Sequence, residues 1–105
     1  MPDSRLDKLL EMLSNQPEDP FLRYAVGFEY EALQKYDLAQ DYYNAVLEDS
    51  PDYLPVYYTA AMLQANLGHV ERAAVLLQKG IDLADALKDQ KTLRELRQAL
   101  EDLEE

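Results

Sequence analysis

Residues 23–51, "RYAVGFEYEALQKYDLAQDYYNAVLEDSP", decide the fold that we expect for this chain. Apolar residues recur in this segment at steps of three and four, which is the pattern of amphipathic helices, and the short polar stretch "QK" interrupts the pattern once. Small residues at Gly27 and Ala39 fall inside the apolar pattern, where the backbones of two helices can approach each other closely. The segment therefore predicts a pair of packed helices that ends at Pro51.

The same spacing continues on both sides of this pair and predicts an all-helical protein of about six helices. No alternation of apolar and polar residues is sustained, and strand-type turns such as Asn-Gly are absent, so we expect no sheet. The expected helices are residues 4–16, 20–34, 37–48, 55–68, 70–87 and 90–104.

Helix-terminus signals support several of these boundaries. Ser4 and Thr92 each begin a candidate capping box, and Asp19 precedes a proline at the first helical position. Gly68 is placed where a left-handed residue can end a helix. Across "KDQKT", residues 88–92, the apolar spacing slips out of phase, which predicts a tight turn before the last helix.

The chain also repeats itself. A shift of 34 residues places Leu13 on Leu47, Tyr24 on Tyr58 and Ala39 on Ala73. A helix-turn-helix unit of this length resembles the tetratricopeptide repeat. The resemblance is clearest in the first unit, where Gly27, Tyr30, Ala39 and Pro51 match the family's pattern of small residue, aromatic residue, small residue and closing proline. The second unit departs from that pattern at Gln64, which replaces the aromatic residue, and it lacks the closing proline.

The resemblance implies an all-α, right-handed α-solenoid of antiparallel helix pairs. One domain, residues 1–105, would hold a half-repeat helix (4–16), two repeats (20–53 and 54–87) and a terminal capping helix (90–104). Small residues at Gly27, Ala39, Ala61 and Ala73 would be close-approach points in this architecture. Neighbouring units bury each other's apolar faces in such arrays.

Residues 53–68, "YLPVYYTAAMLQANLG", contain no charged side chain in a chain whose formal net charge is -11. A membrane-spanning helix needs about 20 mostly apolar residues, and this stretch is too short and too polar. By the repeat pattern it contains the inner helix of the second repeat. We therefore expect this helix to be packed on most sides, which leaves little solvated surface for charges.

The charge balance limits the classes of partner. With 21 acidic and 10 basic residues, the chain would repel nucleic acids and anionic membrane surfaces. A protein or peptide that is apolar or basic is the favoured partner. The first residues, "MPDSRLDKLL", lack the uninterrupted apolar run of a secretory signal, so a cytoplasmic location is expected.

Signals for chemistry are weak, and we expect neither an enzyme nor a cofactor. The chain has no cysteine, and its one histidine, His69, has no second histidine with which to form a metal or nucleophile site. Asp82, Asp85 and Asp89 follow at helical spacing, but a continuous helix does not supply the turning backbone of a calcium loop. We interpret them as a solvated acidic face.

Aromatic residues suggest binding instead. Tyr30, Tyr43 and Tyr57 are expected to point into the packing between helices. The family's inner helices line a concave groove, and the resemblance implies that seven residues here face a partner protein: Phe21, Tyr24, Phe28, Glu31, Tyr58, Met62 and Ala65. The alternative is that the terminal helix covers these side chains as core.

Two functions of different class fit these observations. The first is an adaptor or scaffold that binds a peptide or helix of a partner in an aromatic groove, and the second is a structural unit that self-associates as a homodimer. Many family members clamp the acidic tails of chaperones with basic and asparagine side chains. The matching positions here are Tyr24, Phe28 and Thr59, none of which can neutralise a carboxylate.

Overall fold

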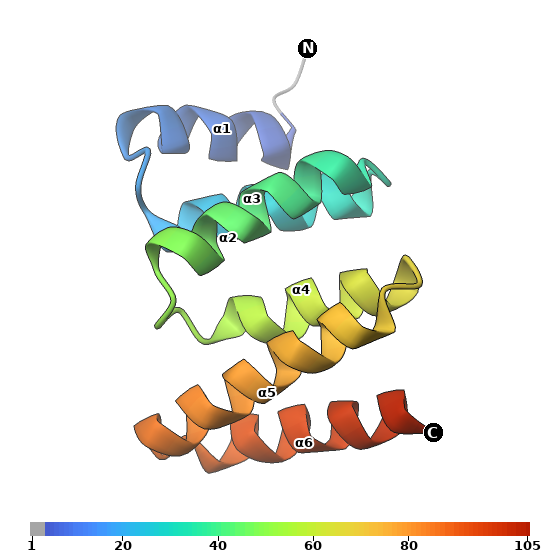
Figure 1. Cartoon of the computed structure of the whole chain (residues 1–105). Helices are drawn as coiled ribbons and strands as arrows, with labels where there is room; N and C mark the ends of the chain where they lie inside the picture. Colours follow the sequence, from blue (N-terminus) through green and yellow to red (C-terminus); the bar gives the residue numbers. More distant parts are fainter. Residues whose placement is uncertain (1–3) are drawn as a thin grey trace. The chain divides into compact units, whose positions relative to one another are not determined.

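The computed structural model of the protein describes residues 4–105, and in this range all regular structure is α-helical. Residues 4–105 form six helices, which confirms the prediction of an all-α fold (Figure 1). The chain divides into two compact units, the first ending at Tyr53 and the second comprising Leu54–Glu105. Each unit is described by itself.

The first unit contains α1 (Arg5–Asn15), α2 (Pro20–Ala32) and α3 (Tyr36–Asp49). Two of the expected N-caps are present: Ser4 Oγ accepts a 3.0 Å hydrogen bond from the backbone N–H of Asp7, and Asp19 Oδ1 accepts one of 3.0 Å from Leu22. Both caps satisfy N–H groups that the first turn of a helix leaves without a partner. The sequence therefore fixes where α1 and α2 begin.

The core of the first unit forms where α2 packs between α1 and α3. Its buried members are Leu9, Leu22, Ala25 and Val26, and half-buried side chains from α1, α2 and α3 pack around them. Gly27 explains the close approach of α2 and α3, because a Cβ atom at this position would lie 2.8 Å from Cε1 of Tyr43. The expectation that Gly27 is a close-approach point is confirmed.

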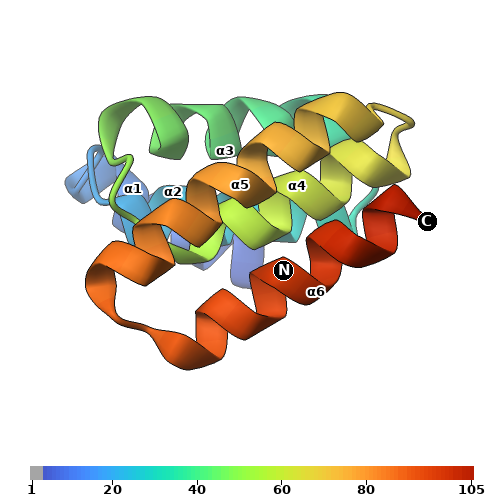
Figure 2. The ribbon, with the colours of Figure 1, turned by 60° about the horizontal axis from the view of Figure 1, so that its bottom comes forward.

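The second unit contains α4 (Pro55–Asn66), α5 (Val70–Leu87) and α6 (Gln90–Glu104). Gly68 has a φ of 89°, the left-handed conformation expected after α4. Helix α5 packs against both α4 and α6, and α5 and α6 run antiparallel across a short turn (Figure 2). The core of this unit consists of seven buried residues: Ala61, Ala73, Leu77, Ile81, Ala84, Leu93 and Leu96.

The start of α6 corrects one prediction. Asp89, not Thr92, is the N-cap: its side chain accepts hydrogen bonds from the backbone N–H of Thr92 at 3.1 Å and from Thr92 Oγ1 at 2.8 Å. The turn consists of Lys88, in the left-handed conformation with φ 60°, and Asp89. Asp89 thus lies outside the helical row that it was expected to share with Asp82 and Asp85.

His69 connects the end of α4 to the start of α5. Its Nδ1 lies 2.9 Å from Oε1 of Gln64, and its backbone N–H donates to the Gln64 carbonyl at 2.8 Å. Gln64 is the only buried polar side chain among residues 4–105, with 3% of its surface exposed. The glutamine that replaces the family's aromatic residue therefore holds the connecting turn.

Candidate functional site

Four of the predicted groove residues lie on one face of α2. Phe21, Tyr24, Phe28 and Glu31 follow one another at steps of three, four and three, so they form a strip along the helix, the α2 strip. Phe21 and Phe28 each leave 52% of their surface exposed. Two half-exposed phenylalanines on one helix face place contiguous apolar surface in contact with solvent.

Tyr24 is fixed in the middle of this strip by its aromatic neighbours. Its ring centroid lies 6.4 Å from that of Phe28, 6.1 Å from Tyr43 and 5.7 Å from Tyr53. Tyr53 was not among the predicted site residues. Burial, together with Tyr24 and Asp19 nearby, raises its pKa above the ordinary tyrosine value. Tyr53 therefore stays neutral at physiological pH and adds an aromatic ring beside Tyr24 of the α2 strip.

Glu31, at the end of the strip, is held by the core. It accepts a 2.8 Å hydrogen bond from the hydroxyl group of Tyr43, whose ring is buried. Burial and this hydrogen bond raise the pKa of Tyr43 far above its usual range, so its hydroxyl remains a donor. One oxygen of Glu31 is engaged in this way, and the carboxylate is fixed at the edge of an apolar surface.

The other three predicted residues lie on α4. Tyr58, Met62 and Ala65 share one face of the helix, but their burial differs. Met62 and Ala65 pack against the core of the second unit, which includes Leu93 and Leu96 of α6. Tyr58 keeps 47% of its surface exposed. Helix α6 thus partly covers this face and leaves the tyrosine open.

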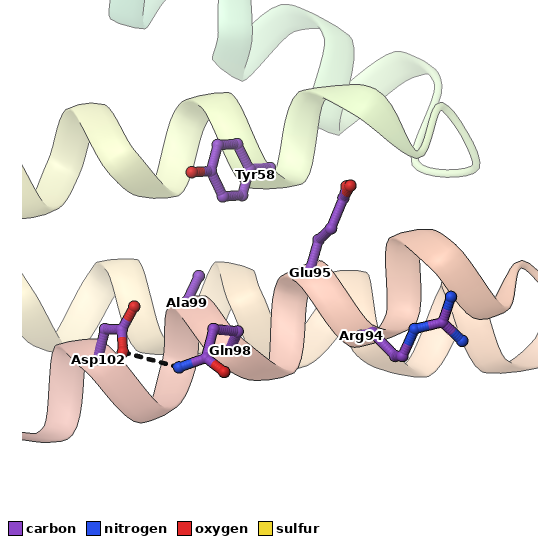
Figure 3. Close-up of a pocket in the computed structure, with 6 residues that line it drawn as sticks. All are labelled: Tyr58, Arg94, Glu95, Gln98, Ala99 and Asp102. Carbon is purple, nitrogen blue, oxygen red and sulfur yellow. Dashed lines mark hydrogen bonds between the residues drawn. The ribbon is translucent and has the colours of Figure 1, made fainter.

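A hollow of about 610 Å³ lies beside Tyr58. Figure 3 shows the ring of Tyr58 pointing from α4 toward α6, with the side chains of Glu95 and Ala99 pointing back toward α4. The hollow, which we call the α4–α6 pocket, is lined by Tyr58, Arg94, Glu95, Gln98, Ala99 and Asp102. An aromatic ring and a methyl group thus form its apolar part, and the rim is polar.

The rim of the α4–α6 pocket is weakly acidic. Gln98 Nε2 donates a 2.9 Å hydrogen bond to Asp102 Oδ1, and Glu95 pairs loosely with Lys91, at 3.9 Å. Both charges of that pair are largely exposed, so the pair adds little stability. Arg94 forms no ion pair within residues 4–105. One cation and two carboxylates line the pocket.

The sequence did not identify the α6 side of this pocket. The leucines at 93, 96, 100 and 103 show which face of α6 is buried, and the pocket residues lie beside that face. The sequence does not show which helix the pocket residues of α6 would face. Amphipathic spacing defines a buried stripe but does not name the helix across from it.

Other classes of site have little support in the part of the chain that the structure describes. In residues 4–105, no three His, Asp or Glu side chains gather in a way that could hold a metal ion. Among the same residues, no helix has the length and apolar character needed to cross a membrane.

Comparison with solved structures identifies the fold. The solution structure of a tetratricopeptide repeat domain protein from Salinibacter ruber has 33% sequence identity and a TM-score of 0.80, and the match covers 84% of this chain and 89% of that one. A crystal structure of such a protein from the same organism has 31% identity and a TM-score of 0.77, covering 82% and 96%. The chain belongs to the tetratricopeptide repeat family.

A third structure, of a protein from Bordetella parapertussis, has a TM-score of 0.82 over 97% of this chain and 89% of that one, and its 22% identity shows the fold alone. No family model matches the sequence, and comparison with curated proteins gives no match. Membership in the tetratricopeptide repeat family confirms the helical-repeat fold and supports a general role in protein interaction.

Proposed function

We propose that this tetratricopeptide repeat protein is an adaptor that binds an apolar or basic peptide or helix of a partner protein through its exposed aromatic residues. The observation that carries the proposal is the exposure of Phe21 and Phe28, each 52%, on one face of α2. Aromatic side chains are enriched at protein interfaces, where they bury large areas with few rotamers to restrict.

The surroundings of the α2 strip favour a basic or apolar ligand over an acidic one. Glu31 lies on the strip itself, and Glu29 follows Phe28 on the same helix. Arg5 pairs with Glu29, through Nε and Oε2 at 3.0 Å, but no cation pairs with Glu31 within residues 4–105. An acidic ligand would meet repulsion on approach and no compensating partner at the strip.

The α4–α6 pocket offers a second contact of similar chemistry. The face of the Tyr58 ring can pack against an aliphatic side chain or a cation. Glu95 and Asp102 on the rim outnumber Arg94. A lysine or arginine whose stem lies on Tyr58 would bring its charge to these carboxylates.

The proposal includes a cytoplasmic location and no catalytic activity. The second of these rests on the sequence, which contains no cysteine and a single histidine.

Titration calorimetry with two synthetic amphipathic helices tests the proposal. One peptide carries leucines on one face and lysines on the other, and the second has glutamate in place of every lysine. We expect micromolar binding of the lysine peptide only. Phe28→Ala should weaken binding at the α2 strip, and Tyr58→Ala should weaken binding at the α4–α6 pocket, each by about tenfold, or 1.4 kcal/mol, as truncation of an aromatic anchor does.

Tyr36→Ala is the matched control, because Tyr36 is also an exposed tyrosine but lies at the start of α3, outside both surfaces. Its affinity should equal that of the parent chain. Tight binding of the glutamate peptide, lost in Tyr58→Ala, would contradict the proposal. Light scattering on the free protein measures whether it forms the alternative homodimer. If the protein is a dimer that Phe28→Ala dissociates, the α2 strip serves self-association.

A further inference from the structure

A second apolar surface lies on the first unit, away from the α2 strip. Helix α1 packs on α2 and α2 packs on α3, while α1 and α3 are less closely packed against each other. In Figure 1, α3 lies in front of α2 and α1 runs alongside. A groove of about 410 Å³ remains, with an apolar lining from Leu10 and Leu13 of α1, Pro17, and Tyr42 and Ala45 of α3. We call it the α1–α3 groove.

The α1–α3 groove and the α2 strip use different faces of α2. Arg23 is the single α2 residue that lines the groove, and neither Phe21 nor Phe28 does so. Arg23 lies about 160° around the helix axis from Phe21, at the 3.6-residue period of an α-helix. A ligand in the groove therefore leaves the aromatic strip free.

The walls of the groove are already fixed in the free protein. The ring of Tyr42 stacks on that of Tyr30, with centroids 5.7 Å apart and 29° between the planes. Leu10 and Leu13 pack on the core of the first unit and remain half-buried. A ligand would therefore meet a preformed surface and would not have to order these side chains.

The charge in the groove is unbalanced. The guanidinium group of Arg23 is already engaged: Nη1 lies 2.6 Å from Asp49 Oδ2, and Nε donates to the carbonyl oxygen of Pro17 at 2.9 Å. Asp41 also lines the groove and has neither a hydrogen-bond nor an ion-pair partner for its carboxylate among residues 4–105. The groove thus presents apolar surface beside one uncompensated negative charge.

Asp37 adds to this imbalance. It lies one helical turn before Asp41 on α3, and its carboxylate also lacks a cation within the described chain. Like charges at positions i and i+4 repel each other across the surface of a helix. A cation placed beside Asp41 would relieve this repulsion.

We propose that the α1–α3 groove is a second docking site, which receives a short amphipathic helix of a partner protein. One leucine-sized side chain of that helix packs between Leu13 and Ala45, and a lysine or arginine one turn away pairs with Asp41. A helix suits the site because apolar anchors at steps of three and four can enter a groove between two helices. Charge complementarity at Asp41 selects a basic partner over an acidic one.

Nuclear magnetic resonance on the ¹⁵N-labelled full chain tests this inference, with the leucine-lysine helix and its leucine-glutamate counterpart as probes. We expect the lysine helix to shift the amide signals of Leu13, Tyr42 and Ala45. Ala45→Leu fills the groove with apolar atoms, so it should weaken binding there roughly tenfold without lowering the melting temperature.

Asp41→Lys should also weaken binding in the groove, by about tenfold, because it replaces attraction by repulsion. Asp52→Lys is the matched control: Asp52 is exposed, precedes α4 and does not line the groove. Affinity within about twofold of the parent chain is expected for this control.

The outcomes distinguish binding in the α1–α3 groove from binding at the α2 strip or the α4–α6 pocket. Shifts confined to the neighbourhoods of Phe28 and Tyr58 would overturn the groove and leave the adaptor proposal standing. Shifts at Ala45 that persist in Phe28→Ala would support docking in the groove, whether or not the α2 strip also binds a ligand. Equal affinity of the glutamate helix for the groove would overturn the role given to Asp41.

Discussion

The hydroxyl group of Tyr43 donates a 2.8 Å hydrogen bond to Oε1 of Glu31. This bond joins a buried ring of α3 to the half-buried Glu31 at the end of the α2 strip. The same bond contributes to the stability of the fold and fixes part of the proposed binding surface, because Tyr43 is buried and Glu31 would contact a ligand. The sequence predicted that Tyr43 packs between helices and that Glu31 faces a partner protein. It did not predict the hydrogen bond between them.

Removing this hydroxyl group should destabilise the fold. Tyr43→Phe keeps the ring and deletes the donor, leaving a partly buried carboxylate oxygen without its partner. We expect the free energy of unfolding to fall by about 1.5–3 kcal/mol, as for a hydrogen bond to a charged group. Urea unfolding of Tyr43→Phe measures it, with Tyr58→Phe as the control at an exposed ring. Equal stabilities of the two variants would show that the bond contributes nothing.

A methyl group at Gly27 should destabilise the fold although alanine favours helices. The new Cβ atom would lie 2.8 Å and 2.9 Å from two ring carbons of Tyr43 and 3.2 Å from Cβ of Tyr42. The Tyr43 ring is buried and hydrogen-bonded, so it cannot move aside easily. Overpacking costs about 1–3 kcal/mol, which exceeds the ~1 kcal/mol gained in helix propensity.

Thermal unfolding of Gly27→Ala tests this balance, and Asn44→Ala on the exposed side of α3 is the control for propensity alone. The control should melt slightly above the parent chain, and Gly27→Ala below it. A rise in melting temperature for both variants would mean that α2 and α3 separate without penalty.

The N-cap of α6 should make stability depend on pH. The backbone and side-chain hydrogen bonds from Thr92, aided by Lys91, hold the pKa of Asp89 below its ordinary value of 3.8. Because the folded-state pKa is depressed, the contribution of this carboxylate is complete above the unfolded-state pKa and is lost as pH falls through the folded-state value.

Asp89→Asn isolates this contribution, since asparagine also caps helices but does not titrate. We expect the parent chain to melt above Asp89→Asn at pH 6, and the difference to vanish as pH falls below about 4. Melting curves at a series of pH values follow this difference. A gap that stays constant down to pH 2 would rule out ionisation of Asp89 as its cause.

Much of the fold could be predicted because periodicity and helix-terminus chemistry agree. The spacing of apolar residues predicted a helix over 70–87, and α5 spans Val70–Leu87. The range 90–104 was right for α6, but its N-cap was assigned to the wrong residue for a physical reason: Asp89 and Thr92 can both cap a helix, and the preceding turn uses Lys88 in a left-handed conformation where glycine is usual. Without a glycine to mark the turn, the sequence favoured the later residue.

The candidate site was less predictable than the fold. The repeat pattern placed Phe21, Phe28 and Tyr58 on their helices, and all three are substantially exposed. It offered cover by the terminal helix only as an alternative, without naming the α6 residues that line the pocket around Tyr58, and it did not predict that Tyr53 would pack on Tyr24. These are contacts across elements, which depend on how helices and their connections pack and not on spacing within one helix.

The uncharged stretch can be tested at Ala61, whose side chain is fully buried among Ala73, Leu77 and the rest of the core of the second unit. Ala61→Glu would force a longer side chain and an unpaired charge into that core. Overpacking and charge burial together should lower the free energy of unfolding by roughly 3–5 kcal/mol. Ala86→Glu makes the same change at an exposed position of α5 and should stay within about 0.5 kcal/mol of the parent chain. Chemical unfolding of both variants compares them directly, because they carry the same charge in the same unit. Ala61→Glu and Ala86→Glu should therefore unfold at different denaturant concentrations. Equal concentrations would show that exclusion of charge from the core is not the reason why α4 contains no charged residue.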